Sequence, residues 1–335
     1  MQNRPRRLRL NQHLRNLVQE HSITAHDLIY PVFIKEGESS QEAISSMPGI
    51  YRWGTESVLR ELEDAQRLGI RAIAIFPVID DQLKTLNAEE SYNPQGLTQR
   101  AIRRIKQEFP ELLLITDVAL DPYTSHGHDG ILENGKIVND KTVEILTLMS
   151  LAQAEAGSDI VAPSDMMDGR ISAIRHKLDK HHHQDTLIMA YTAKYASSLY
   201  APFREALGSL NSKELVASLA RDDEAPQDKK TYQMNIANSK EALKELELDL
   251  AEAADIVMVK PAGWYLDIVH QFKSKSTVPV AAYQVSGEYS MIHAAAQAGY
   301  LDLDQAIYES LISIKRAGAD LILTYFAKNF LEHRS

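Results

Sequence analysis

Short apolar runs alternate with longer amphipathic stretches along the whole chain. The apolar runs are nearly continuous rather than alternating with polar residues, which is typical of parallel strands buried on both faces of a sheet. In chain order the runs are Ile29–Ile34, Ala72–Val78, Leu112–Leu120, Asp159–Ser164, Thr186–Lys194, Asp255–Pro261, Val278–Ser286 and Leu321–Ala327. The pattern predicts eight buried strands.

A helical stretch follows each predicted strand, and several of these stretches end in glycine. ESVLRELEDAQRLG and DKTVEILTLMSLAQAEAG are two examples, and glycine is the residue that most often ends a helix. Eight strand–helix units favour a closed (β/α)₈ TIM barrel over an open doubly wound sheet. We therefore expect a single α/β barrel domain over residues 29–335, with its chemistry at the carboxyl ends of the strands.

Two segments do not follow the barrel pattern. Residues 1–28 begin with MQNRPRRLRLNQHLRN, which holds several arginines and no acidic residue. We expect an oligomerisation arm that lies on a neighbouring subunit, with a disordered basic tail or an organellar transit peptide as alternatives. A long polar connection around residues 201–232 follows the fifth strand. It is a candidate active-site lid, although a solvated surface loop explains the composition about as well.

Composition excludes several classes of function. The net charge is -10, which argues against a nucleic-acid partner. Cysteine is absent, so disulfides, thiolate-bound zinc and cysteine nucleophiles are excluded. The apolar runs are too short to span a membrane, and we expect a cytoplasmic protein. Dinucleotide and P-loop motifs are missing, so no organic cofactor is expected.

Polar residues cluster at the predicted carboxyl ends of the strands. They are Asp117 on the third strand, Ser164 with Asp165 and Asp168 after the fourth, Lys194 and Lys260 closing the fifth and sixth, Ser286 closing the seventh, and Tyr325 in the eighth. Structural hydrogen bonding could explain any one of these residues, but it explains the whole set poorly.

Lys194 and Lys260 are the most informative pair. Burying an ammonium at the end of an apolar strand is costly without a partner. For one lysine, an ion pair with Asp117 is as good an explanation as catalysis. Two lysines on neighbouring strands favour catalysis, because each charge depresses the pKa of the other and frees an amine to form a Schiff base with a ketone.

Two histidine-containing segments allow a metal. Asp117–Gly130 reads DVALDPYTSHGHDG, and its aspartates and histidines could bind a cation, although its glycines equally suggest a mobile loop. The tract His181–His183 precedes the fifth strand, at the barrel end opposite the expected site. We interpret it as a solvated connection.

Several long motifs together resemble the porphobilinogen synthase, or 5-aminolevulinate dehydratase, family. They are DVALDPYTSHGHDG, APSDMMDGR, AYTAKYASSLYAPFREA, KTYQMN, VMVKPAGWYLDI, YQVSGEYSM and RAGADLILTYFAK, and the resemblance extends over nearly the whole chain. It implies a hydro-lyase of heme and porphyrin biosynthesis that condenses two 5-aminolevulinate molecules into porphobilinogen with loss of two waters.

The resemblance also implies roles for individual residues. Lys194 and Lys260 would each form a Schiff base with one substrate molecule, and Asp117 would assist proton transfer. Ser286 and Tyr325 would hold the carboxylate of one substrate. Arg204 and Lys229, with Gln233 nearby, would hold the carboxylate of the other. Members of this family usually assemble as homo-octamers through the N-terminal arm.

The metal sites of the family are altered in this sequence. Three cysteines that hold zinc in many members are here Ala119, Asp121 and Asp129. Oxygen ligands favour hard cations, so Asp121 and Asp129 are candidate ligands for Mg²⁺ or K⁺. Glu245 matches the carboxylate ligand of an allosteric Mg²⁺ site in the magnesium-responsive members. Without the resemblance, Glu245 would be an ordinary exposed helix residue.

Other departures lie near the substrate positions. Lys229 stands where an arginine is often found, so it keeps the charge but loses the bidentate fork. Ala262 and Trp264 depart from the usual sequence after Lys260.

Two other functions are compatible with a barrel of this kind. A Schiff-base aldolase would need one essential lysine and leaves the second unexplained. A non-catalytic binding or assembly barrel predicts the loss of a lysine or of the Ser286–Tyr325 pair, and neither is lost.

Overall fold

The computed structural model describes residues 3–208 and 226–333. Within these residues, eight parallel strands form a closed barrel, because the last strand pairs with the first. The barrel strands are β1 (Leu28–Lys35), β4 (Ala72–Val78), β5 (Leu113–Val118), β8 (Ile160–Pro163), β9 (Leu187–Lys194), β10 (Ile256–Lys260), β11 (Val280–Gln284) and β12 (Leu321–Thr324). The predicted (β/α)₈ barrel is confirmed.

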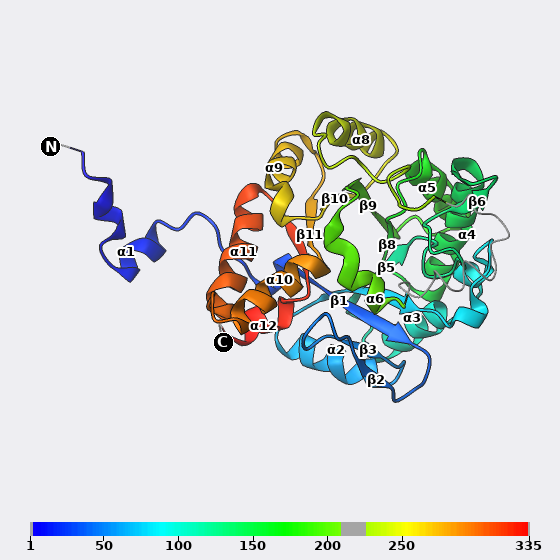
Figure 1. Ribbon diagram of the computed structural model, residues 1–335, viewed down its shortest axis with the longest axis horizontal. Coiled ribbons are helices and arrows are strands. Elements are labelled where there is room, and N and C mark those ends of the chain that lie inside the picture. The colour runs from blue at the N-terminus through cyan, green and yellow to red at the C-terminus, as the bar shows by residue number, and fades with distance from the viewer. Residues whose placement is uncertain (1–2, 209–225, 334–335) are drawn as a thin grey trace.

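Helices surround the barrel, and one short helix, α6 (Ala201–Ala206), lies over its mouth (Figure 1). They are α2 (Ser57–Arg67), α3 (Leu97–Glu108), α4 (Asn139–Ala156), α5 (Arg170–Lys180), α6 (Ala201–Ala206), α8 (Lys240–Ala251), α9 (Leu266–Lys275), α10 (Ser286–Gln297), α11 (Leu303–Ala317) and α12 (Ala327–Glu332). Short 3₁₀ turns lie between them: η2 (Ala25–Asp27), η3 (Asp81–Leu83), η4 (Glu89–Tyr92), η5 (Ser198–Tyr200) and η7 (Gly263–Tyr265).

The sequence pattern accounts for these elements. Seven residues of β9 are buried in succession, as expected for a strand covered on both faces. Gly157 ends α4 with a φ of 109°, and Gly318 ends α11 with a φ of 121°. These left-handed conformations favour glycine because it has no Cβ.

Two small hairpins have no counterpart in the predicted pattern. Strands β2 (Gln41–Ala43) and β3 (Tyr51–Trp53) pair beyond β1, and β6 (Ile131–Glu133) pairs with β7 (Lys136–Val138). Each strand has three residues, which is too short for a detectable period. Arg52 on β3 donates to the main-chain oxygens of Glu205 and Ala206 at 2.5 and 2.6 Å. The first hairpin therefore fixes the end of α6.

The N-terminal arm projects away from the barrel in Figure 1. It carries η1 (Pro5–Arg9) and α1 (Gln12–Leu17), and neither element buries a residue. Leu10 is 72% exposed and Leu17 is 78% exposed. Ile23 is the first buried apolar residue after α1, and the ion pair of Asp27 with Lys315 holds the chain to the barrel.

Two further predictions concern segments beyond the strands. The expected lid around 201–232 includes α6 and the residues from 226 onward, while residues 209–225 lie outside the described part of the chain. Among the described residues, none of the helices has the length and apolar character that a bilayer crossing requires.

Candidate active site

The two candidate lysines lie side by side at the carboxyl ends of adjacent strands. Lys194 is the last residue of β9 and Lys260 is the last residue of β10, and the two are directly paired in the strand register. Each is only 6% exposed. The expectation of two buried amines on neighbouring strands is therefore met by the fold.

Aromatic rings surround the ammonium group of Lys260. Its Nζ lies 4.6 Å from the ring centre of Tyr283, 5.0 Å from Tyr191, 5.1 Å from Phe203 and 5.2 Å from Tyr200. We call these four residues the aromatic cage. Ring faces attract a cation, but they also exclude the water that would solvate it.

The cage has a direct electrostatic consequence for Lys260. Burial, followed by the charge of Lys194, lowers the pKa of Lys260 to about 7 against the opposing charge of Asp117. Among the described residues, no carboxylate forms an ion pair with Lys260. A neutral amine is therefore available near neutral pH, as a Schiff-base nucleophile requires.

Lys194 has a different environment. Its Nζ forms an ion pair with Asp129 at 3.0 Å and donates to the main-chain oxygen of Ser164. An ion pair with Asp117 was the alternative explanation for a strand-end lysine, but the partner of Lys194 is Asp129. Asp129 lies twelve positions further along the same loop, and the bend of that loop brings it to the strand end.

Asp129 is the centre of a small charged network. Its carboxylate also pairs with Lys229 at 2.6 Å and accepts from the Tyr232 hydroxyl at 3.0 Å. Burial raises the pKa of Asp129, but the charges of Lys194 and Lys229 outweigh burial and hold it well below its usual range. Asp129 is therefore ionised while it bridges the two lysines.

The candidate metal ligands of the loop contact an ammonium group. Lys229 pairs with Asp121 at 3.1 Å as well as with Asp129. Across residues 3–208 and 226–333, no group of three or more histidines or carboxylates is arranged to hold a metal ion. The cation that lies between Asp121 and Asp129 is thus the Lys229 side chain.

Asp117 is buried at the end of β5 near both strand-end lysines. Burial and the charge of Asp121 raise its pKa to about 7, against the charges of Lys194 and Lys260 and a hydrogen bond with Ser164. A carboxyl group that titrates near neutral pH can both donate and accept a proton.

The candidate carboxylate-binding residues lie around the same mouth, just beyond the strands. Strand β11 ends at Gln284 and β12 at Thr324, so Ser286 opens α10 and Tyr325 follows β12, rather than lying within the predicted strands. The Ser286 hydroxyl accepts from the Phe203 amide at 3.0 Å, and the Tyr325 hydroxyl lies 2.9 Å from that of Tyr283.

The remaining candidates come from the connection after β9. Arg204 lies on α6 next to the cage residue Phe203 and is exposed. Gln233 is buried, and its main-chain N–H donates to the main-chain oxygen of Lys229 at 2.8 Å. Arg204 thus lies near the start of this connection, on α6, and Lys229 lies near its end.

Sequence reasoning missed the aromatic cage. Its signal was present as tyrosines within otherwise apolar strand runs, at Tyr191 and Tyr283. A buried tyrosine brings a polar hydroxyl that needs a hydrogen-bond partner, so a tyrosine inside an apolar strand run indicates a polar group within the barrel.

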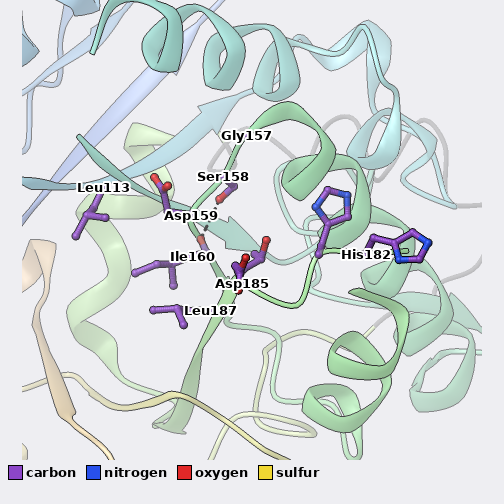
Figure 2. A pocket seen from close by; sticks show the side chains of 10 residues that line it. Leu113, Gly157, Ser158, Asp159, Ile160, His182, Asp185 and Leu187 are labelled. Carbon is purple, nitrogen blue, oxygen red and sulfur yellow. Dashed lines mark hydrogen bonds between the residues drawn. The ribbon is translucent and has the colours of Figure 1, made fainter. Parts of the chain in front are cut away.

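A cavity of about 540 Å³ lies at the opposite end of the barrel (Figure 2). Its lining includes Leu113, Ile160 and Leu187, which are the first residues of β5, β8 and β9. His182 and His183 lie at its edge, in the connection before β9. The tract His181–His183 is thus at the end remote from the lysines, as expected.

Comparison with known proteins gives a consistent family. A family model described as delta-aminolevulinic acid dehydratase matches residues 2–333. The chain is 51% identical to the delta-aminolevulinic acid dehydratase of Bradyrhizobium diazoefficiens, over 98% of this chain and 90% of that protein. It is 52% identical to the chloroplastic enzyme of Physcomitrium patens, over 97% of this chain and 72% of that protein.

A solved structure is similar over the same extent. The crystal structure of delta-aminolevulinic acid dehydratase from Toxoplasma gondii ME49, in complex with its product porphobilinogen, superposes with a TM-score of 0.93. The two chains are 49% identical, and the match covers 99% of this chain and 92% of that one.

Proposed function

The chain belongs to the delta-aminolevulinic acid dehydratase family, and on that basis we propose that it condenses two molecules of 5-aminolevulinate into porphobilinogen. The reaction joins the two molecules and releases two waters, and it makes the enzyme a lyase of heme and porphyrin biosynthesis. The observation that carries the proposal is the direct pairing of two buried strand-end lysines, Lys194 and Lys260.

Each lysine would activate one substrate molecule. The neutral amine attacks the substrate ketone carbon, and loss of the carbonyl oxygen as water leaves an iminium. Iminium formation makes the neighbouring carbon acidic, which allows a carbon–carbon bond to form. Lys260 has the environment for this attack near neutral pH, because its cage lowers its pKa to about 7. Asp117, with its pKa raised to about 7, would carry protons between these steps.

Two sets of polar groups would hold the substrate carboxylates. Ser286 and Tyr325 flank Lys260 at the ends of the next two strands, so they would hold the carboxylate of the molecule bound there. Arg204 and Lys229, with Gln233, would hold the other. A substrate carboxylate would then replace Asp129 on Lys229, because both carry the same charge.

A direct assay tests the proposal. Purified protein is incubated with 5-aminolevulinate alone, and pyrrole formation is measured with and without Mg²⁺. Borohydride reduction followed by peptide mass spectrometry should label Lys194 and Lys260. A single-Schiff-base aldolase would label one lysine and form no pyrrole, and a binding protein would do neither.

Magnesium is proposed to act at Glu245 on α8, away from the lysines. Burial and the charges of Asp249 and Asp168 raise the pKa of Glu245 to about 6, against the charge of Arg170. Buried carboxylate oxygens of Asp165 and Asp249 make no hydrogen bond. Asp165 and Asp249 are paired with the buried Arg170, so the site would rest on Glu245 and on the waters that Mg²⁺ keeps, since this ion needs only one or two protein carboxylates. Glu245 would be its direct ligand, and the ion would neutralise this group of carboxylates.

Removing this carboxylate should remove the response to magnesium. We expect Glu245→Gln to raise the Mg²⁺ concentration needed for half-maximal stimulation at least about 10-fold. Activity is measured over a Mg²⁺ titration. Glu247→Gln is the matched control, because Glu247 is an exposed glutamate on the same helix. An unchanged titration in the Glu245 variant would remove Glu245 from the site.

The N-terminal arm is proposed to hold a homo-octamer together. The exposed Leu10 and Leu17 give it an apolar surface that the protein's own barrel does not cover. Deleting residues 1–24 should reduce the particle from an octamer to smaller species, measured by light scattering. The double variant Leu10→Asp, Leu17→Asp should have the same effect, whereas Glu20→Gln should leave the particle size unchanged. An octamer that survives the deletion would contradict this role.

The cellular compartment stays a prediction. The absence of cysteine fits the reducing cytoplasm, and some similar relatives are chloroplastic.

A further inference from the structure

A buried carboxylate connects the loops that follow two of the catalytic strands. Glu288 is the third residue of α10 and is 6% exposed. Its Oε2 accepts from the Val285 amide at 2.8 Å, and its Oε1 accepts from the Gly263 amide at 2.7 Å. Gly263 lies three residues after Lys260, and Val285 immediately precedes Ser286. One side chain therefore joins the end of β10 to the end of β11.

A helix cap explains only half of this arrangement. The bond to Val285 satisfies an amide at the start of α10, as a glutamate at the third helical position often does. The bond to Gly263 satisfies no group of that helix, since it crosses to a segment 25 residues away. A Cβ at position 263 would overlap Oε1 of Glu288, so any other residue there would displace that oxygen from the contact.

Burying the Glu288 carboxylate costs free energy of folding, which indicates that the side chain has a specific role. Within residues 3–208 and 226–333, no lysine or arginine forms an ion pair with Glu288. Burying this carboxylate without a cation raises the pKa of Glu288 to about 7, and the main-chain amides of Val285, Gly263 and Ala262 offset only part of that cost. Capping α10 alone would need no more than a serine or an aspartate at the start of the helix.

We propose that Glu288 is a positioning residue that fixes Lys260 relative to Ser286. The inference rests on the proposed function, in which these two residues address the ketone and the carboxylate of one substrate molecule. Both groups must keep their separation to a fraction of an ångström for the bound ketone to meet the amine. Glu288 sets that separation by holding the main chain just beyond Lys260 and just before Ser286.

The two lysines should respond differently to the loss of Glu288. The Lys194 ammonium group is held by Asp129 and by the main-chain oxygen of Ser164, whereas Glu288 bonds to the amides of Gly263 and Val285. Loss of the bridge should therefore affect chemistry at Lys260 and leave Lys194 able to form its own Schiff base.

Two variants break the bridge in different ways. Glu288→Gln keeps the shape of the side chain but turns one acceptor into a donor that faces an amide N–H. Gly263→Ala keeps Glu288 and displaces its Oε1 through the new Cβ. Glu309→Gln is the matched control, because Glu309 is an exposed glutamate on α11. For each variant, kcat, KM and borohydride labelling at each lysine are measured on the full-length enzyme.

Both variants should lower kcat by roughly 100-fold and reduce labelling of Lys260, while Lys194 is labelled as in the unchanged protein. A normal kcat in both variants would overturn the proposal. An equal loss of labelling at both lysines would also overturn it, because Glu288 would then be only a structural residue. The protein without substitutions distinguishes failure of the Glu288 proposal from failure of the proposed function. If borohydride labels neither lysine in that protein, the proposed function itself fails.

Discussion

Replacing Lys260 by methionine is expected to lower the rate of pyrrole formation by roughly 10⁴-fold or more, because the variant has no amine at the substrate ketone. Methionine suits the position because its unbranched apolar chain fills the aromatic cage once the charge is gone. No ion-pair partner among the described residues is left behind. The fold should therefore persist while the reaction stops. The measurement is kcat in the pyrrole assay, with the melting temperature as the check on folding.

Comparison with Lys194 sharpens this prediction. Lys194→Met should also abolish activity, but it leaves Asp129 with only Lys229 as a cationic partner, so it should destabilise the fold more than Lys260→Met. Lys230→Met is the control, because Lys230 is exposed and pairs with Asp228 on the surface. If Lys260→Met kept more than about a tenth of the activity, a covalent role for Lys260 would be untenable.

The strands of the barrel could be predicted because buried parallel strands leave a strong signal in sequence. Each predicted run overlaps one strand of the closed barrel, and Ala72–Val78 matches β4 at both ends. The predicted ends were least accurate at the seventh and eighth strands. There Ser286 and Ala327 open helices, because a helix that begins directly after a strand leaves no turn residues to mark the boundary in the sequence. The three-residue hairpins left no period to detect.

The site was predictable to the extent that it depends on strand ends. Lys194, Lys260 and Asp117 were found because a polar residue that closes an apolar run must lie at the barrel mouth. The partner of Lys194 was not found, since it depends on how the loop from Asp117 to Gly130 bends, and a loop of this length has no periodicity. The aromatic cage depends on the sheet order, which places β9 and β11 on either side of β10, and on the fold of α6 over the strand ends.

Replacing Asp117 by asparagine should reduce kcat by roughly 10²- to 10³-fold and change its pH dependence. The pKa of Asp117 is raised to about 7 and that of Lys260 is lowered to about 7, so a proton could pass between these two groups near neutral pH. Asparagine keeps the size and removes the titration. The loss in kcat follows because a positioned carboxyl no longer gives and takes the protons of imine formation.

The direction of the pH shift follows from the charges. Lys260 must be neutral to attack, so activity on the acid limb rises as pH increases through about 7. The negative charge of Asp117 raises the pKa of Lys260, and its removal lets that pKa fall. The acid limb of kcat/KM should therefore move to lower pH in Asp117→Asn. The same shift should occur in the pH dependence of borohydride labelling at Lys260, which reports imine formation without the later steps. A limb that stays in place or moves to higher pH would mean that Asp117 does not act on Lys260.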